Sequence, residues 1–244
     1  MHTLTRATLL AQLLIKEQFK EPIALFWILL SPGAIFYLLA FSKGHIYFQQ
    51  DYRSATAWFY AYIALSIAFF GFSFYIVGRR ESGFMRSFIY TPHAKFVFLS
   101  AQFMAYSSIA FIYCLVFYLI TRLPFGAYSI HEILIIAARF YCCFIVFCIP
   151  GLLLTLLPLN FQTANTVFSI ASFFMLALGI AQSAFPENTR ALFNTLNLLS
   201  LGKAIMADGI QTYRITIISA FIIFVITMKS VCKHLRINPV WSRY

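Results

Sequence analysis

Six apolar stretches, each of about 20 residues, take up most of this 244-residue chain, and an α-helix of that length spans the roughly 30 Å hydrocarbon core of a bilayer. The stretches cover residues 23–42, 56–78, 97–120, 133–157, 163–184 and 213–233. This pattern predicts an all-α, polytopic membrane protein with six transmembrane helices. The connecting segments are too short for a soluble catalytic domain, so residues 1–244 are expected to form a single transmembrane domain.

The composition agrees with a membrane location rather than with nucleic-acid binding. Apolar residues make up 61% of the chain and charged residues 10%, whereas soluble domains carry roughly 25% charged residues. The net charge of +11 suits loops that lie against anionic lipids, so membrane lipids are expected partners and nucleic acid is not. The five cysteines lie in or beside the apolar stretches without a CxxC spacing, and no metal site is predicted.

Lysine and arginine are distributed unequally between the two sets of connecting segments. The N-terminus, the segment between the second and third stretches and the C-terminus together hold 11 of these residues, and the alternate segments hold 5. The positive-inside rule therefore places both termini in the cytoplasm, with residues 234–244 as a cytoplasmic tail.

Further segments outside the six stretches are expected to be ordered at the membrane. Residues 1–22 predict an amphipathic surface helix, because Gln12, Lys16 and Lys20 recur at i, i+4 spacing among apolar residues. Residues 185–212 are too polar to span and too apolar to lie free in water, which predicts a re-entrant outer hairpin between helices five and six. The cytoplasmic loop 79–96 is expected to contain a short helix that ends before Thr91-Pro92.

The sequence contains no complete set of catalytic residues of an enzyme. A phosphate-binding loop is absent, since the Gly202-Lys203 pair is followed by alanine. The segment Gly71-Phe72-Ser73-Phe74 has the GxSx spacing of an intramembrane serine protease, but all five histidines fall outside the predicted spans. Ser73 is therefore predicted to be a small helix-packing residue. The seven acidic residues also lie at termini or in loops, which disfavours a proton-coupled transporter.

Polar residues inside or beside the spans mark candidate positions for a substrate. Arg139 lies within the fourth stretch, where it can pair with Glu132, extend to the outer surface, or contact an anionic group of a substrate. Pro150-Gly151 can kink the same helix, and the turn that follows is rich in amides. The candidates for a substrate path are Arg139, Asn160, Gln162, Asn165 and Gln182.

Three segments together resemble the membrane subunit of ATP-binding-cassette type-2 exporters. The segment 20–27 is similar to the family's start of span one, with charged residues, a Glu-Pro pair and an apolar Phe-Trp pair. The segment 80–92 resembles the family's R-E-x-G loop that ends in Thr-Pro, although Phe84 stands where threonine is usual. Phe185-Pro186 and the apolar residues that follow resemble the family's outer hairpin, without its Asn-Pro pair.

The resemblance implies an export permease rather than an enzyme. Two such subunits, this chain with a second copy or a sister permease, would stand on separate ATPase subunits. ATP and Mg would be bound there, and this chain would bind no cofactor. The residues that would meet the ATPase are Lys16, Glu17, Lys20, Glu21, Arg80, Glu81 and Arg86.

The Arg-Glu-x-Gly loop is more similar to the drug, antibiotic and peptide exporters than to the polysaccharide permeases of this family. The expected cargo is therefore an antimicrobial peptide or a small hydrophobic or amphipathic compound. It would leave across the bacterial inner membrane, as part of antibiotic or bacteriocin resistance or immunity. The alternative is a membrane immunity or assembly factor that binds a toxin or scaffold without transport.

Overall fold

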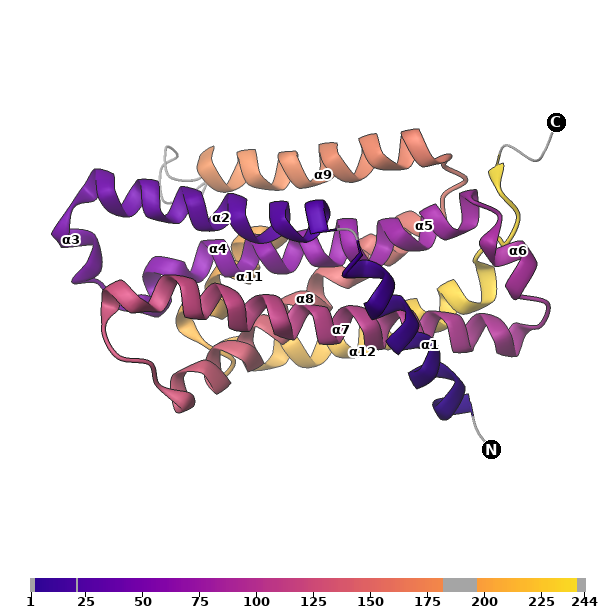
Figure 1. The fold of residues 1–244 in the computed structure, drawn as a ribbon, viewed down its shortest axis with the longest axis horizontal. Helices are drawn as coiled ribbons and strands as arrows, with labels where there is room; N and C mark the ends of the chain where they lie inside the picture. Colours follow the sequence, from indigo (N-terminus) through magenta and orange to yellow (C-terminus); the bar gives the residue numbers. More distant parts are fainter. Residues whose placement is uncertain (1–2, 21, 182–196, 241–244) are drawn as a thin grey trace.

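The structure is a computed structural model that describes residues 3–20, 22–181 and 197–240. Regular structure in these residues is helical, and the long helices run side by side as an elongated bundle (Figure 1). The elements are α1 (Thr3–Gln18), α2 (Pro22–Lys43), α3 (His45–Phe48), α4 (Tyr52–Ser66), the π-helix η1 (Ile67–Ser73), α5 (Phe74–Glu81), α6 (Phe84–Phe88), α7 (Pro92–Arg122), the 3₁₀ turn η2 (Leu123–Phe125), α8 (Ile130–Thr155), α9 (Phe161–Ala181), α11 (Leu198–Asp208) and α12 (Arg214–His234).

Within the residues that the structure describes, five helical stretches are long and apolar enough to cross a membrane. They are Tyr52–Glu81, Pro92–Phe125, Ile130–Thr155, Phe161–Gly179 and Arg214–His234. The all-α prediction is therefore confirmed for the described residues, and the second to sixth predicted spans each coincide with one of these stretches. The first predicted span coincides with α2, whose described apolar part, Phe26–Ser42, is shorter. A sixth crossing stays a prediction.

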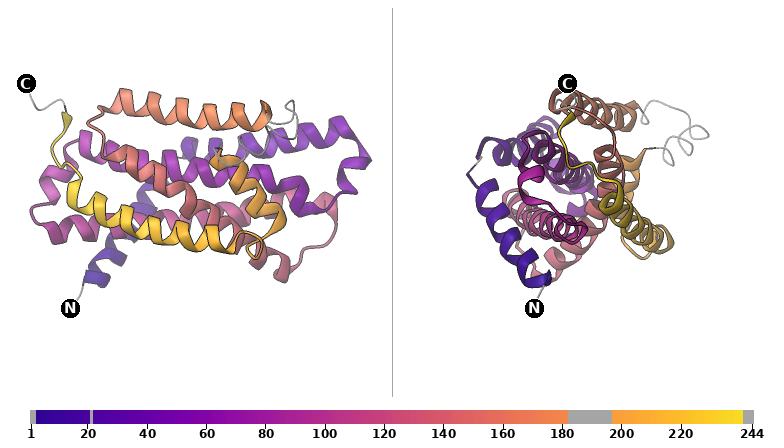
Figure 2. Two further views of the ribbon diagram at one scale, coloured as in Figure 1. Left: turned by 180° about the vertical axis from the view of Figure 1, so that it is seen from behind. Right: turned by 90° about the vertical axis from the view of Figure 1, so that its right-hand side faces the viewer.

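The continuous helix α4–η1–α5 forms the centre of the bundle. Of its most apolar window, 72% is buried, against 17% for α9 and 28% for α12. Accordingly, α9 lies along one side of the bundle in all three views (Figures 1 and 2). It is attached by aromatic contacts, such as Phe69 with Phe168, whose ring centroids are 5.6 Å apart in an edge-to-face arrangement. The peripheral position leaves most of α9 available to lipid or to another subunit.

The π-helix η1 packs closely against α8 at a glycine, which has no side chain to keep the two helices apart. A Cβ atom added at Gly151 would lie 2.3 Å from the hydroxyl oxygen of Ser73. Ser73 is completely buried at this contact, so its predicted packing role is confirmed. The preceding residue, Pro150, lies inside α8, which continues to Thr155. The close approach of η1 and α8 is thus made possible by one glycine and one small side chain.

The predicted N-terminal helix forms and lies across α7. Ala7, Ala11 and Leu14 of α1 are buried in a cluster with Ala101 and Ala105 of α7. Small residues on both helices let the two backbones approach closely, as they do at membrane helix interfaces. The α1 helix lies outside the main bundle and at an angle to α7 (Figures 1 and 2). The position of α1 on a membrane surface stays a prediction.

The described part of the predicted outer hairpin is α11. It packs against α4 and α8, and a Cβ atom added at Gly202 would lie 2.7 Å from the Phe147 ring. Residues 182–196 lie outside the described residues, so the hairpin itself stays a prediction and nothing is assigned to Gln182.

At the opposite end of the bundle from α3 lie α1, α6 and the segment after α12 (Figure 1). We call this the α6 end.

Candidate coupling site

Arg80 occupies the centre of the α6 end. Its side chain is completely buried, and its guanidinium donates to three carbonyl oxygens at the end of α8 and in the turn to α9. The distances are 3.0 Å from Nη1 to Thr155, 3.3 Å from Nη1 to Leu157 and 2.5 Å from Nη2 to Leu159. The last carbonyls of a helix have no partner within that helix. Arg80 therefore supplies the missing donors from a different helix.

Glu81 completes this arrangement. One carboxylate oxygen accepts a hydrogen bond from Arg80 Nε at 2.9 Å, and both oxygens lie 3.2 Å from the backbone nitrogen of Val240. Arg80 and Glu81 thus connect the end of α5, the turn between α8 and α9, and the C-terminal segment. Both side chains are turned into the protein, so they could act on a partner only through the elements that they hold together.

Gly83 separates this buried pair from the exposed α6. Its φ of 77° lies in the left-handed region, which favours glycine because a Cβ would be strained there. The chain reverses at this point and forms α6, the short helix predicted in the cytoplasmic loop. Thr91 then begins α7, and its hydroxyl accepts a hydrogen bond from the Ala94 nitrogen at 3.1 Å. The predicted break at Thr91-Pro92 is therefore confirmed.

A second ion pair joins α1 to α5. The Arg79 guanidinium donates to the Glu17 carboxylate and to the Tyr75 hydroxyl. Nearby, the Tyr106 hydroxyl donates to the Gln18 side-chain oxygen at 2.6 Å. Glu17 was a predicted coupling residue, whereas Arg79 was missed. Adjacent residues on a helix point about 100° apart, which allows Arg80 to face the core while Arg79 faces α1.

The remaining predicted coupling residues form the exposed part of this end. Lys16 and Lys20 on the N-terminal segment and Arg86 on α6 are all exposed. Glu21 lies outside the described residues. The α6 end thus has one buried ion pair, Arg80–Glu81, the partly exposed pair Glu17–Arg79, and exposed cations on its outside, which is a surface suited to an acidic partner.

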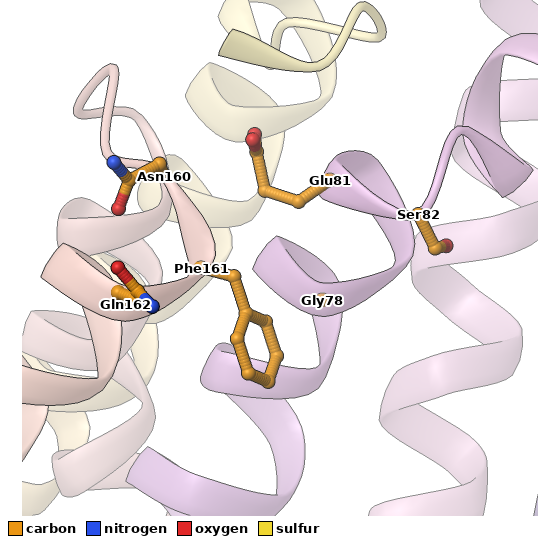
Figure 3. Close-up of a pocket in the computed structure, with 6 residues that line it drawn as sticks. All are labelled: Gly78, Glu81, Ser82, Asn160, Phe161 and Gln162. Atoms are coloured by element: carbon orange, nitrogen blue, oxygen red, sulfur yellow. The ribbon is translucent and has the colours of Figure 1, made fainter. Parts of the chain in front are cut away.

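A pocket of about 490 Å³ opens beside Glu81. Its lining includes Asn160 and Gln162, so the structure brings two predicted substrate-path residues next to a predicted coupling residue (Figure 3). The Phe161 ring lies between α9 and α5, facing Gly78 (Figure 3). A second pocket of about 460 Å³ shares Phe161 and Gly78 and extends to α1. The ring therefore stands between two adjoining pockets.

The amides predicted for a substrate path have different environments. The side-chain oxygen of Asn160 accepts a hydrogen bond from the Thr163 nitrogen at 2.8 Å, as an N-capping residue does. Asn165 is exposed on α9. Asn160 thus has a structural role at the start of α9, and its side chain also lines the pocket beside Glu81.

Arg139 is located away from the α6 end, at the end of α11. Its Nη1 donates to the carbonyl oxygens of Met206 at 2.7 Å and Ala207 at 3.0 Å. The pairing with Glu132 that the sequence allowed is wrong, because Glu132 accepts from Arg122 Nε at 2.6 Å. Arg122 lies across the loop from Glu132, whereas Arg139 is drawn to the unpaired carbonyls of α11. Contact with an anionic substrate stays a prediction.

The amino-acid sequence of the chain is similar to that of a known bacterial protein. The chain is 25% identical to Protein McbE of Escherichia coli over 235 residues, which cover 96% of this chain and 97% of McbE. The similarity therefore extends over almost the whole of both proteins rather than over a single motif. No family model matches the chain, and no solved structure matches it significantly. Within the described residues, His, Cys, Asp and Glu form no group of three that could hold a metal ion.

Proposed function

We propose that this chain is the membrane-spanning subunit of an ATP-binding-cassette type-2 exporter in the bacterial inner membrane. It would move an antimicrobial peptide or a small hydrophobic or amphipathic compound out of the cell. A separate ATPase subunit would supply the energy, and both termini would be cytoplasmic. The observation that carries the proposal is the α6 end, where the Glu17–Arg79 ion pair joins α1 to α5 and hydrogen bonds from Arg80 join α5 to the turn between α8 and α9.

The mechanism depends on rigid connections. A partner that moves α1 or α6 can drive a transmembrane helix only if the contact between them does not give way. The pair of Glu17 and Arg79 connects α1 to α5. Arg80, which is paired with Glu81 on the same helix, connects α5 to the α8–α9 turn through its hydrogen bonds to the carbonyl oxygens there, next to the pocket that is lined by Asn160 and Gln162. A displacement at the surface would therefore reach α5, α8 and α9 together.

A second permease subunit is expected on the weakly packed side of the bundle. The helix α9 buries the smallest share of its apolar window among the five candidate spans, and it exposes Ile170, Phe173 and Phe174. On α2, Trp27 and Leu38 are also exposed. These two helices supply apolar surface on which a second copy or a sister permease could pack.

The test is co-purification of the tagged chain from its native cells in mild detergent, with mass spectrometry of the proteins that accompany it. We expect a nucleotide-binding subunit. A variant in which Lys16, Lys20 and Arg86 are all replaced by Glu should lose this subunit. The matched control is Lys203→Glu, an exposed lysine on α11, which should retain it. Repeated absence of an ATPase from intact, folded protein would instead favour the factor that binds a toxin or scaffold without transport.

A further inference from the structure

An apolar groove of about 440 Å³ lies between the start of α7 and the end of α12. Phe96 and Leu99 line it from α7, and Phe224 and Met228 line it from α12. The same helix contributes Lys229 and Lys233, which lie four positions apart on one face at the α6 end of the groove. The groove thus has an apolar length and a basic end.

The two lysines have no charge partner in the part of the chain that the structure describes. Both are exposed, neither takes part in the described ion pairs, and the described groove lining contains no carboxylate. The neighbouring Lys95 is directed to the Leu235 carbonyl oxygen at 2.9 Å. Positive charge therefore accumulates at the mouth of an otherwise apolar groove, which suits an anion attached to an apolar chain.

The length of the groove corresponds to one leaflet of a bilayer. Phe224 and Lys233 are separated by nine residues, or about 14 Å along the helix axis, which is about half of the roughly 30 Å hydrocarbon core. An extended acyl chain matches this length and the apolar lining.

We propose that this groove binds one anionic phospholipid of the leaflet at the α6 end. The acyl chain would lie along Phe224, Met228 and Leu99, and the phosphate would lie between Lys229 and Lys233. The lipid would fill the contact between α7 and α12, a helix that is otherwise weakly packed against the bundle. The inference needs only that the chain spans a membrane, and it does not depend on an ATPase partner.

The test measures lipid binding to the purified full-length chain in detergent by native mass spectrometry. The probes are phosphatidylglycerol and phosphatidylcholine with identical acyl chains. We expect tighter binding of phosphatidylglycerol. Lys229→Ala and Lys233→Ala should each weaken it by about fivefold, the contribution of one basic residue near an anionic membrane surface. Lys203→Ala, which removes an exposed lysine outside the groove, should change nothing.

A second variant tests the apolar part independently. Met228→Trp should fill the groove, keep both lysines, and weaken the binding of both lipids. Equal affinity for the two lipids, or phosphatidylglycerol binding that survives the loss of both lysines, would overturn the proposal. Displacement of phosphatidylglycerol by soluble poly-glutamate at the same sites would also overturn it, because it would indicate an acidic protein segment as the occupant.

Discussion

Arg80 Nη1 donates to the carbonyl oxygen of Thr155 at 3.0 Å, across 75 positions of sequence. Thr155 is the last residue of α8, so Arg80 caps that helix from outside it. A cation at this position also complements the partial negative charge at the C-terminal end of a helix. The turn from α8 to α9 is therefore fixed by the end of α5. This contact places Arg80, a charged residue of the segment 80–92, inside the protein instead of on its surface.

Replacing Arg80 should destabilise the protein. Arg80→Gln would remove the cation of the buried Arg80–Glu81 pair, and loss of one partner from a buried ion pair typically costs about 3–5 kcal/mol. Arg80→Lys should be intermediate, because lysine keeps the charge but lacks the planar set of donors. The measurement is denaturant unfolding in detergent. Arg86→Gln is the control, since substitution of an exposed residue usually changes stability by about 0.5 kcal/mol or less. Equal stability of the Arg80 and Arg86 variants would contradict the assignment.

Exchanging charges between α1 and α5 should separate coupling from folding. Glu17→Arg brings two cations together, and Arg79→Glu brings two carboxylates together. Each change should lower stimulation of the reconstituted ATPase by substrate, while stability falls by only about 1 kcal/mol or less, as for other exposed pairs.

The double variant, Glu17→Arg with Arg79→Glu, restores opposite charges and should recover the stimulation. A double variant as inactive as the single ones would show that the pair does not transmit movement. Glu81→Lys is a poorer probe, because it places a second cation beside buried Arg80 and so changes folding as well.

The helical pattern was predictable because apolar length and periodicity are local properties. The packing role of Ser73 also followed from the sequence, because no histidine lies in the predicted spans to activate it. The π-helix η1 was not predicted. Over its seven residues, the apolar sequence is compatible with α- or π-helical backbone, and the contact with Gly151 is formed by a distant helix.

The site was predicted in part, for a related physical reason. Sequence resemblance selected Arg80 and Glu81, but the direction of each side chain depends on where the end of α8 lies. Arg79 was missed because its carboxylate partner is 62 positions away on α1. Asn160 could have been recognised as an N-cap, since asparagine before an apolar helix is a standard start signal.

Arg139→Leu should reveal a structural role. The substitution would remove the hydrogen bonds that the Arg139 guanidinium donates to the partly buried carbonyls of Met206 and Ala207, at a cost of about 1–3 kcal/mol for hydrogen bonds to a charged group. Transport of anionic and neutral substrates should decrease alike, together with the amount of folded protein. The measurement is uptake into inverted vesicles, normalised to folded protein. Selective loss of anionic substrates at normal stability would instead indicate direct contact with the substrate.

Adding a methyl group at Gly151 should disturb the contact between the second and fourth spans. In Gly151→Ala the new Cβ would lie 2.3 Å from Ser73 Oγ and 3.4 Å from the Ala68 carbonyl oxygen. Because η1 and α8 are both buried here, the helices must separate, and overpacking of this kind usually costs about 1–3 kcal/mol. Unfolding in detergent measures this loss.

The companion change Ser73→Gly removes both side-chain atoms that the new methyl group would meet. The double variant should therefore lose less stability than the sum of the two single variants, because the clash is present only when both side chains are there. Gly33→Ala on α2 is the matched control, since a Cβ there has no described atom within 4 Å. Strict additivity at Gly151 and Ser73 would mean that the loss of stability in Gly151→Ala does not come from the close approach of η1 to α8.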